Sequence, residues 1–286
     1  MVVVIGCVVV LGAVLGGFTM AGGKVGALIH PSEFVTIGGA ALGALILMSP
    51  KKVLVDLVKG MVQSLKGSPY DKRGYEELLQ FSYELLKTAR RDGTIAVESH
   101  ISNPHQSSIF GKYPRIEKNH HVMDFLCRAL SPVIDGTVTA EQLPKLLEAE
   151  LHVLEEEHHA PLGVLSKTAD ALPGFGIVAA VLGIVITMMH IDGPVEEIGE
   201  KVGAALVGTF LGILMSYGFL GPMAVRMEFL GTAELSYFRA LAGVAEAMAT
   251  GVAPKVAVEG ACRRMSSEVR PNREELDQIY AKVDAS

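Results

Sequence analysis

Four long apolar stretches constrain what this 286-residue chain can fold into. They are residues 2–21, 34–49, 172–191 and 202–225, and none carries an acidic or basic side chain in its middle. At a rise of about 1.5 Å per residue, a helix of about 20 such residues crosses the hydrocarbon core of a bilayer. The second stretch is shorter and depends on its flanks. The chain is therefore predicted to be a membrane protein with four transmembrane helices, and any ion that crosses it needs a titrating group from another chain.

Composition agrees with this prediction and excludes other classes of protein. Half of the residues are hydrophobic, 20% are charged and 31 are glycine. The formal charge of −6, without a basic patch interleaved with aromatic residues, predicts no nucleic-acid partner. The three cysteines, at positions 7, 127 and 262, fit neither a disulfide framework nor a zinc site, and they are typical of a reducing compartment.

Charges beside the spans predict the topology. Four lysines follow the second stretch and Arg226 follows the fourth, and basic residues that flank spans stay in the cytoplasm. Lys24 is the first positive charge, so the N-terminal stretch lacks the basic start of a signal peptide and is predicted to be a retained span. Both termini are therefore expected in the cytoplasm, with the protein in the inner membrane. The expected parts are residues 1–49 (two spans and a short periplasmic loop), 50–171 (a cytoplasmic helical domain), 172–225 (two spans and a short periplasmic loop) and 226–286 (cytoplasmic C-terminal helices).

The cytoplasmic segments are predicted to be helical, which makes the fold class all-α. Apolar residues mark one helical face over residues 71–91, and Asp92-Gly93 ends that helix. A second helix is expected over residues 115–130. A third is expected from Thr139, with Gln142 completing a capping box. Three more are predicted near the C-terminus, over residues 228–249, 253–265 and 274–283.

Small residues recur on one face of the third and fourth spans. In the third span the series is Pro173, Gly176, Ala180, Gly183 and Thr187. In the fourth span it is Ala205, Thr209, Gly212 and Ser216, and Gly208 with Gly212 forms a GxxxG motif. Such faces let helices approach closely in lipid. Two interpretations stay open: plain helix–helix contact, or a narrow polar pathway lined by the Thr209 and Ser216 hydroxyls, although an isolated hydroxyl in a span often bonds its own backbone four residues back.

Two prolines lie near the cytoplasmic ends of these spans. Pro173 is expected at the first turn of its helix, where the missing N–H has no partner to lose. Pro222 comes late in its helix and is expected to free a carbonyl and bend the helix. In the simpler interpretation, both prolines have only a structural role: one starts a helix and the other bends one. In the functional reading, they form a hinge that passes a change in the membrane to the cytoplasmic domain.

Clusters that would indicate an enzyme or a metal site are weak in this sequence. His158 and His159 follow three glutamates, with His152 nearby, but a solvated helix face explains them without a fixed set of ligands. No nucleophile elbow, P-loop or dinucleotide fingerprint occurs. The chain is therefore predicted not to be an enzyme and to bind no cofactor or metal.

Several motifs, in order and with similar spacing over almost the whole chain, resemble the MotA family of flagellar motor stator subunits. The motifs are residues 172–181 (LPGFGIVAAV), residues 207–214 (VGTFLGIL), Tyr217-Gly218 before Pro222, residues 18–23 (FTMAGG), Glu98 with Asn103-Pro104, Tyr113-Pro114-Arg115, and residues 268–271 (EVRP). The related TolQ and ExbB transducers share the pattern of the third and fourth spans but resemble proteins with three spans. An energy-transducing subunit of that kind is the alternative function, and a structural membrane scaffold is a third.

The resemblance implies partners and an ion. Five MotA-like chains would surround two MotB-like single-span subunits, each bringing the channel aspartate, and membrane lipid would surround the complex. Gly176, Ala180, Thr209 and Gly212 would face the ion pathway and this partner. Sodium-type relatives place a threonine where this chain has Ala180, beside the threonine that matches Thr209. A sodium ion needs several oxygen ligands, and the small-residue faces of the third and fourth spans offer few. We therefore expect proton coupling.

The resemblance also implies a contact with the rotor. Arg90 and Glu98 match the charged residues that generate torque in the family, so the rotor switch protein FliG is the expected partner. Without the resemblance, Arg90 would be interpreted as a solvated cation at the C-terminal end of a helix.

Overall fold

The structure is a computed structural model that describes residues 2–285, and every regular element in that range is helical. The all-α prediction is therefore confirmed. Four helical segments are long and apolar enough to cross a membrane: Val2–Met20, Val25–Met48, Leu143–Met188 and Val195–Ala249. Each contains most of one predicted span, which confirms their number. By their internal contacts the residues form two compact units, one of residues up to 67 with 157–230, the other of residues 68–156 with those from 231 onward.

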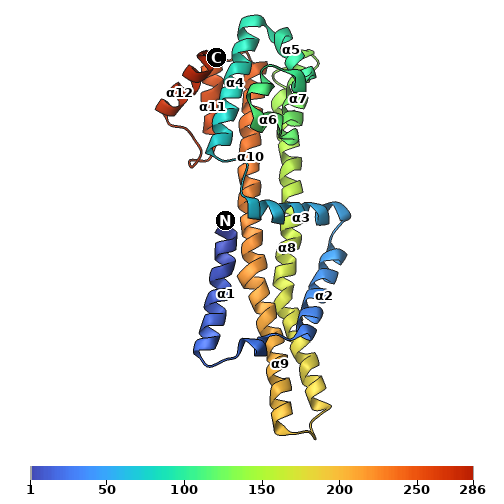
Figure 1. The fold of residues 1–286 in the computed structure, drawn as a ribbon. Coiled ribbons are helices and arrows are strands. Elements are labelled where there is room, and N and C mark those ends of the chain that lie inside the picture. The colour runs from blue at the N-terminus through green and yellow to red at the C-terminus, as the bar shows by residue number, and fades with distance from the viewer. Residues whose placement is uncertain (1, 286) are drawn as a thin grey trace. The chain divides into compact units, whose positions relative to one another are not determined.

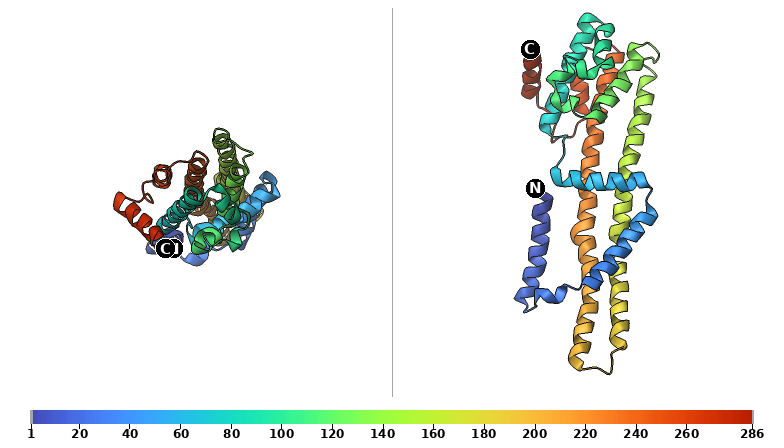
Figure 2. Two further views of the ribbon diagram at one scale, coloured as in Figure 1. Left: turned by 90° about the horizontal axis from the view of Figure 1, so that it is seen from above. Right: turned by 45° about the vertical axis from the view of Figure 1, so that its right-hand side comes forward.

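The first unit holds the apolar helices, and we call it the membrane unit. Figures 1 and 2 show helix α3 lying crosswise to α2 and to the membrane-unit parts of α8 and α10. Its elements are α1 (Val2–Met20), the 3₁₀-helix η1 (Val25–Leu28), α2 (Pro31–Met48), α3 (Lys51–Lys66), residues 157–188 of α8 (Leu143–Met188), α9 (Val195–Ile213), the π-helix η4 (Leu214–Leu220) and residues 221–230 of α10 (Gly221–Ala249).

Two apolar clusters hold the membrane unit together. One joins α2, α8 and α9 through Ile37, Ala41, Leu172, Ala179, Val207 and Leu211. The other joins α3, α8 and α10 through Leu57, Leu165, Ala224 and Met227. Helix α1 has no buried residue, so its apolar side chains need lipid or another subunit to cover them.

Helix α8 differs from the prediction because it is a single helix of 46 residues with Pro161 and Pro173 inside it. The expectation that Pro173 stands at the first turn of a helix is therefore wrong. The predicted helix start is close: the backbone N–H of Thr139 donates to Gln142 Oε1 over 3.1 Å, and α8 begins at Leu143. The expected boundary between residues 171 and 172 thus lies within a continuous helix, and it remains a prediction of where the membrane surface lies.

Pro222 is accommodated by a change of helix type. The chain runs without a break from α9 through the π-helix η4 into α10, and Pro222 is the second residue of α10. The N–H of Gly221 donates to the carbonyl of Ser216, five residues back, which is the π pattern. A wider turn therefore precedes the proline, where the missing N–H removes an α-helical bond.

The second unit, residues 68–156 with those from 231 onward, has one extended core. The aromatic residues Tyr75, Phe81 and Phe110 are among its largest fully buried side chains. Its elements are α4 (Lys72–Asp92), α5 (Thr94–Ser102), the short 3₁₀-helices η2 (Pro104–Gln106) and η3 (Phe110–Lys112), α6 (Pro114–Glu117), α7 (His120–Ile134), residues 143–156 of α8, residues 231–249 of α10, α11 (Pro254–Arg263) and α12 (Arg273–Asp284).

Local signals account for the ends of these helices. Asp71 caps α4 by accepting from the backbone N–H of Gly74, and Gly93 ends the helix with a φ of 87°, which favours glycine. The helix predicted over residues 115–130 is instead divided into α6 and α7. Asn119 caps α7 by accepting from the N–H of Val122, and this new start separates the two helices.

Candidate functional site

The small residues of α8 and α9 meet at a close helix crossing. A Cβ placed on Gly176 would lie 2.8 Å from the carbonyl oxygen of Gly208 and 3.2 Å from the Cα atoms of Thr209 and Gly212. A Cβ on Gly212 would lie 2.6 Å from the carbonyl oxygen of Leu172. All of these neighbours are backbone atoms. Only glycine lets the two helices approach this closely without moving apart.

The structure brings the four predicted pathway positions together, while their role in ion transport remains a prediction. Gly176 faces Gly212 and Thr209 directly. The backbone nitrogen of Ala180 lies 3.4 Å from a Cβ placed on Gly208, the residue before Thr209. Gly176 and Gly212 serve contact between helices, and Ala180 and Thr209, both half-buried, lie beside this contact, so the pathway interpretation stays a prediction.

One hydroxyl group of this region bonds its own helix, and another is more accessible. Thr187 is fully buried and donates to the carbonyl of Gly183, four residues back, over 2.9 Å. This is the local bond that removes a hydroxyl from a pathway. Ser216 is buried within the π-helix η4. Thr209 is therefore the more accessible of the two hydroxyls that were predicted to line a pathway.

A carboxyl group that the sequence interpretation placed in a loop lies beside this crossing. Glu33 is only 7% exposed, and its Oε2 would be 2.5 Å from a Cβ on Gly208. That oxygen has no hydrogen-bond partner among the residues the structure describes. An unpartnered buried carboxyl group is costly, and an ionisable residue in a span indicates function by default. The absence of a side chain at Gly208 makes room for this group.

The position of Glu33 corrects the reasoning about titrating groups. The second span was expected to begin at Phe34, with Glu33 in the preceding loop, but α2 begins at Pro31 and includes Glu33 in its first turn. The sequence did contain a signal for this start. Proline at the first helical position followed by an acidic residue in the first turn is typical of a helix N-terminus.

Pro173 and Pro222 differ in their surroundings. Pro173 is half-buried in the middle of α8. Pro222 lines a cavity of about 550 Å³ in the membrane unit. The polar residues around that cavity are His159, Ser166, Asp170, Tyr217 and Glu228. The structure therefore places one of the two predicted hinge residues against a cavity that these polar residues line in part, and the coupling role of both remains a prediction.

The predicted rotor-facing residues are both on the surface of the second unit. Arg90 lies in the last turn of α4 and Glu98 in the middle of α5, with the Gly93 turn between them, and both are exposed. Within residues 2–285 neither forms an ion pair or hydrogen bond, whereas the neighbouring Arg91 pairs with Asp92 over 2.7 Å. Two unpaired charges of opposite sign are therefore available to another protein.

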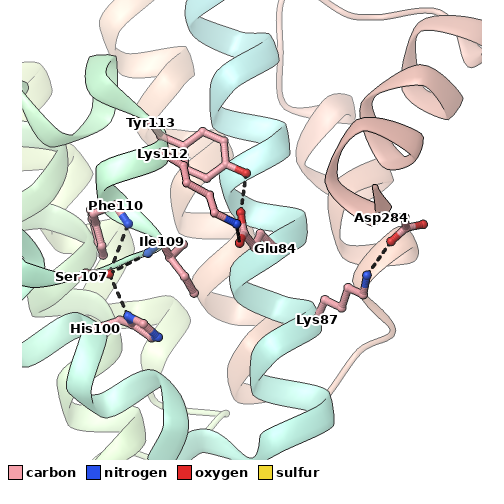
Figure 3. A network of polar contacts seen from close by, with 9 residues as sticks. All are labelled: Glu84, Lys87, His100, Ser107, Ile109, Phe110, Lys112, Tyr113 and Asp284. Atoms are coloured by element: carbon pink, nitrogen blue, oxygen red, sulfur yellow. Dashed lines mark hydrogen bonds and ion pairs between the residues drawn. The ribbon is translucent and has the colours of Figure 1, made fainter. Parts of the chain in front are cut away.

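Polar contacts hold the helix that presents Arg90. Figure 3 shows Glu84 of α4 accepting from Lys112 over 2.6 Å and from the Tyr113 hydroxyl over 2.7 Å. One helical turn further, Lys87 donates to Asp284 of α12 over 2.7 Å, and this contact lowers the pKa of the Asp284 carboxyl. Burial raises the pKa of the Tyr113 hydroxyl, so it stays a donor to Glu84. These contacts fix the end of α4 on both sides.

A similar set of contacts orders the loop that follows α5. The hydroxyl of Ser107 accepts from the backbone N–H groups of Ile109 and Phe110, and it lies 2.8 Å from His100 Nδ1 at the end of α5 (Figure 3). Ser107 is buried, so these bonds replace contacts with water. The helix that carries Glu98 is therefore tied to a structured loop.

Two family models match the chain. "Motility protein A N-terminal" matches residues 4–93, and "MotA/TolQ/ExbB proton channel family" matches residues 117–240. Among solved structures, the Campylobacter protein in "Structure of C. jejuni MotAB" has a TM-score of 0.77 at 22% identity, covering 95% of this chain and 98% of that one. The flagellar MotAB stator complex from Bacillus subtilis gives a TM-score of 0.73 at 23% identity, covering 90% and 92%. These structures share the fold.

Curated relatives cover nearly the whole chain. Motility protein A of Salmonella typhimurium is 36% identical over 283 residues, 99% of this chain and 96% of its own length. Motility protein A of Escherichia coli is 35% identical over the same shares, and the chemotaxis protein LafT of Vibrio parahaemolyticus is 36% identical over 98% of both chains. With the two matching family models, this similarity shows that the chain belongs to the Motility protein A family, within the MotA/TolQ/ExbB proton channel family.

Proposed function

We propose that this chain is a stator subunit of the bacterial flagellar motor. With a MotB-like single-span partner it forms a proton channel that converts proton flow into torque on the rotor. The observation that carries this proposal is the α8–α9 crossing, where Gly176 lies against Thr209 and Gly208 lies against Ala180 in a member of a proton channel family. The chain is a multi-pass protein of the inner membrane and not an enzyme.

The partner supplies the group that carries the proton through the complex. Solved relatives of the same fold are MotAB complexes, which supports a MotB-like partner and an oligomeric assembly. In this proposal five copies of the chain surround two partner helices, and each partner brings one aspartate to the ring of Thr209 side chains. The exposed apolar surface of α1 supports such an assembly in lipid. Each proton that crosses is driven by the membrane potential, about 2.3 kcal/mol per 100 mV.

Basic residues support an orientation with both termini in the cytoplasm. Lys51, Lys52, Lys59 and Lys66 all lie in α3, which begins two residues after α2 ends, and Arg226 lies in the first turns of α10. The positive-inside rule then puts residues 50–171 and 226–286 in the cytoplasm. The short connections before α2 and between α8 and α9 would face the periplasm.

The rotor contact follows from this orientation. Arg90 and Glu98 would meet complementary charges on the rotor switch protein FliG, where charge sets encounter and register more than affinity. Protonation of the partner aspartate would be passed on through Pro173 of α8 and through Pro222 with the π-helix before it. An ExbB- or TolQ-type role is less well supported, because the match to the Motility protein A N-terminal family covers residues 4–93.

Proton flux should require the partner. In vesicles that hold this chain alone we expect no proton uptake above that of empty vesicles, because the central carboxylate is absent. Vesicles with the chain and its partner should take up protons at a rate that does not depend on external sodium. The reason is that alanine at position 180 offers no side-chain oxygen to a sodium ion. A fluorescent pH indicator measures both. Uptake by the chain alone, or swimming that follows external sodium and survives an uncoupler, would contradict the assignment.

Charge reversal at the rotor-facing surface should stop rotation without harming assembly. We expect Arg90→Glu and Glu98→Lys each to lower swimming speed strongly, while membrane insertion and co-purification with the partner stay at wild-type levels, because both side chains are exposed and unpaired. The controls are Lys145→Glu and Glu148→Lys, exposed charges on α8 in the same unit. A compensating reversal on the rotor should restore part of the speed. If the reversals at positions 90 and 98 swim like the controls, these residues are ordinary surface charges.

A further inference from the structure

Helix α3 (Lys51–Lys66) presents three different faces. The first packs against the membrane unit: Leu57 is 2% exposed and joins Leu165, Ala224 and Met227 in an apolar cluster. Gly60 lies on the same face, where a Cβ would be 2.5 Å from Met227 Cε. This face holds α3 to α8 and α10.

The second face is apolar and stays about half exposed among residues 2–285. Val55, Val58, Val62 and Leu65 are 45%, 61%, 43% and 47% exposed. Their spacing of three, four and three residues puts them in one line along the helix. At about 3.6 residues per turn this line lies about a third of a turn from Leu57. A helix packed sideways on α8 and α10 therefore keeps a separate apolar line facing away from them.

The third face is basic. Lys52, Lys59 and Lys66 are seven residues apart and lie about half a turn from Leu57, while Lys51 at the start of the helix lies in line with Val55 and Val58. All four side chains are exposed. Lys52 pairs with Glu157 and Lys59 lies 3.7 Å from Asp56, both at the surface. With Asp56 as the one acidic residue of α3, the helix carries four positive charges against one negative.

The position of α3 in the membrane unit indicates that lipid covers its apolar line. The spanning helix α2 ends at Met48, and α3 begins at Lys51 after Ser49-Pro50. Figures 1 and 2 show α3 crosswise to α2. A helix tied within three residues of the end of a span and running across it lies at the surface of the bilayer. An apolar line beside a row of lysines is the pattern of a helix that lies in the membrane interface.

We propose that α3 is a binding surface for anionic phospholipids of the leaflet in which α2 ends. Val55, Val58, Val62 and Leu65 enter the boundary between head groups and acyl chains. Lys51, Lys59 and Lys66 extend from the same helix to the head groups, because the long apolar part of a lysine side chain can follow the interface while the ammonium stays in water. Each lysine near an anionic surface strengthens binding about fivefold. The proposal requires that α2 spans the membrane, and it does not depend on the stator function.

A lipid-contact experiment on the full chain tests the apolar line. The chain is purified with its three native cysteines replaced by alanine, and a fluorescent label is attached at Val58→Cys or, as the matched control, at Gln63→Cys on the basic side of the same helix. Both are placed in nanodiscs that contain spin-labelled phosphatidylcholine. We expect the label at position 58 to be quenched at least threefold more than the label at position 63. Equal quenching at both positions would overturn the proposal. A disulfide between two copies that forms under an oxidant when the cysteine at position 58 is left unlabelled would also overturn it.

Lipid selectivity tests the lysines. With spin-labelled phosphatidylglycerol in place of spin-labelled phosphatidylcholine, quenching at position 58 should rise severalfold at low salt. The change of Lys51, Lys59 and Lys66 to glutamine should remove that preference while leaving phosphatidylcholine quenching unchanged. Lys118, Lys145 and Lys282, exposed lysines of the second unit, are the control triple and should keep the preference when changed to glutamine. If the control triple and the α3 triple behave alike, the lysines of α3 do not select anionic lipid.

Discussion

Gly212→Ala is expected to abolish swimming and to destabilise the chain. A Cβ at this position would lie 2.6 Å from the carbonyl oxygen of Leu172, 3.0 Å from the Cα of Gly176 and 3.1 Å from its nitrogen. These are backbone atoms, so the side chain has no space unless α8 and α9 move apart. Overpacking of this kind costs about 1–3 kcal/mol, and separation of the helices would also displace Thr209 from Ala180. Thermal unfolding of the purified chain and swimming speed measure the two effects.

Gly203→Ala is the matched control for this substitution. Gly203 lies in the same helix, α9, and a Cβ there would meet no atom within 4 Å. It makes the same change in helix propensity, since alanine replaces glycine in both. We expect Gly203→Ala to leave swimming intact and to hold or raise the unfolding temperature. If the two variants behaved alike, close approach of α8 and α9 would not matter for function.

Glu33→Met is expected to separate stability from function. The carboxyl group is buried against Gly208 with one oxygen unpartnered, and leaving such a group unsatisfied costs about 1–3 kcal/mol. An unbranched apolar side chain of similar length removes that cost, so the free energy of unfolding of the purified chain should rise. Proton flux through the complex should nevertheless fall about tenfold, equivalent to about 1.4 kcal/mol in the barrier, because an ionisable group beside the crossing is lost.

Glu200→Met is the control for this second prediction. Glu200 is an exposed glutamate in the early turns of α9. Its substitution should change neither the unfolding free energy beyond about 0.5 kcal/mol nor the flux, as is usual for surface positions. A Glu33→Met variant that conducts at the wild-type rate would show that the carboxyl group serves packing alone. A variant that is less stable than the wild type would show that the carboxyl group is not a cost to folding of the purified chain.

Local patterns predicted much of the second unit. The end of α4 at Asp92 and its glycine stop follow from residues that are neighbours in the chain, and so do the apolar faces of the C-terminal helices. The division between α6 and α7 was missed, although Asn119 is a good N-cap, because the apolar pattern continues across it. At such a point the N-cap favours a new helix, whereas the apolar pattern favours a continuous one. The structure shows that the N-cap determines the outcome.

The candidate site was predicted in part. The small-residue faces of α8 and α9 indicated their own contact, since a line of glycines at helical spacing has few other uses in lipid. The burial of Glu33 was not predictable in this way. It depends on α2 lying over Gly208, which is far away in the sequence, and no local pattern reports such a contact. The role of Arg90 and Glu98 came from the family resemblance, because exposed charges at the end of a helix carry little information by themselves.

The sequence by itself determined the class of this protein, because uncharged runs long enough to cross a bilayer are a property of composition and length. It also determined where most helices of the second unit begin and end, through caps and glycine turns that act within a few residues. Tertiary structure alone decided that α8 continues through Pro173, that a π-helix precedes Pro222, and that Glu33 faces Gly208. These three features depend on which helices pack together, and packing between distant segments sets helix continuity and burial where local preference is weak.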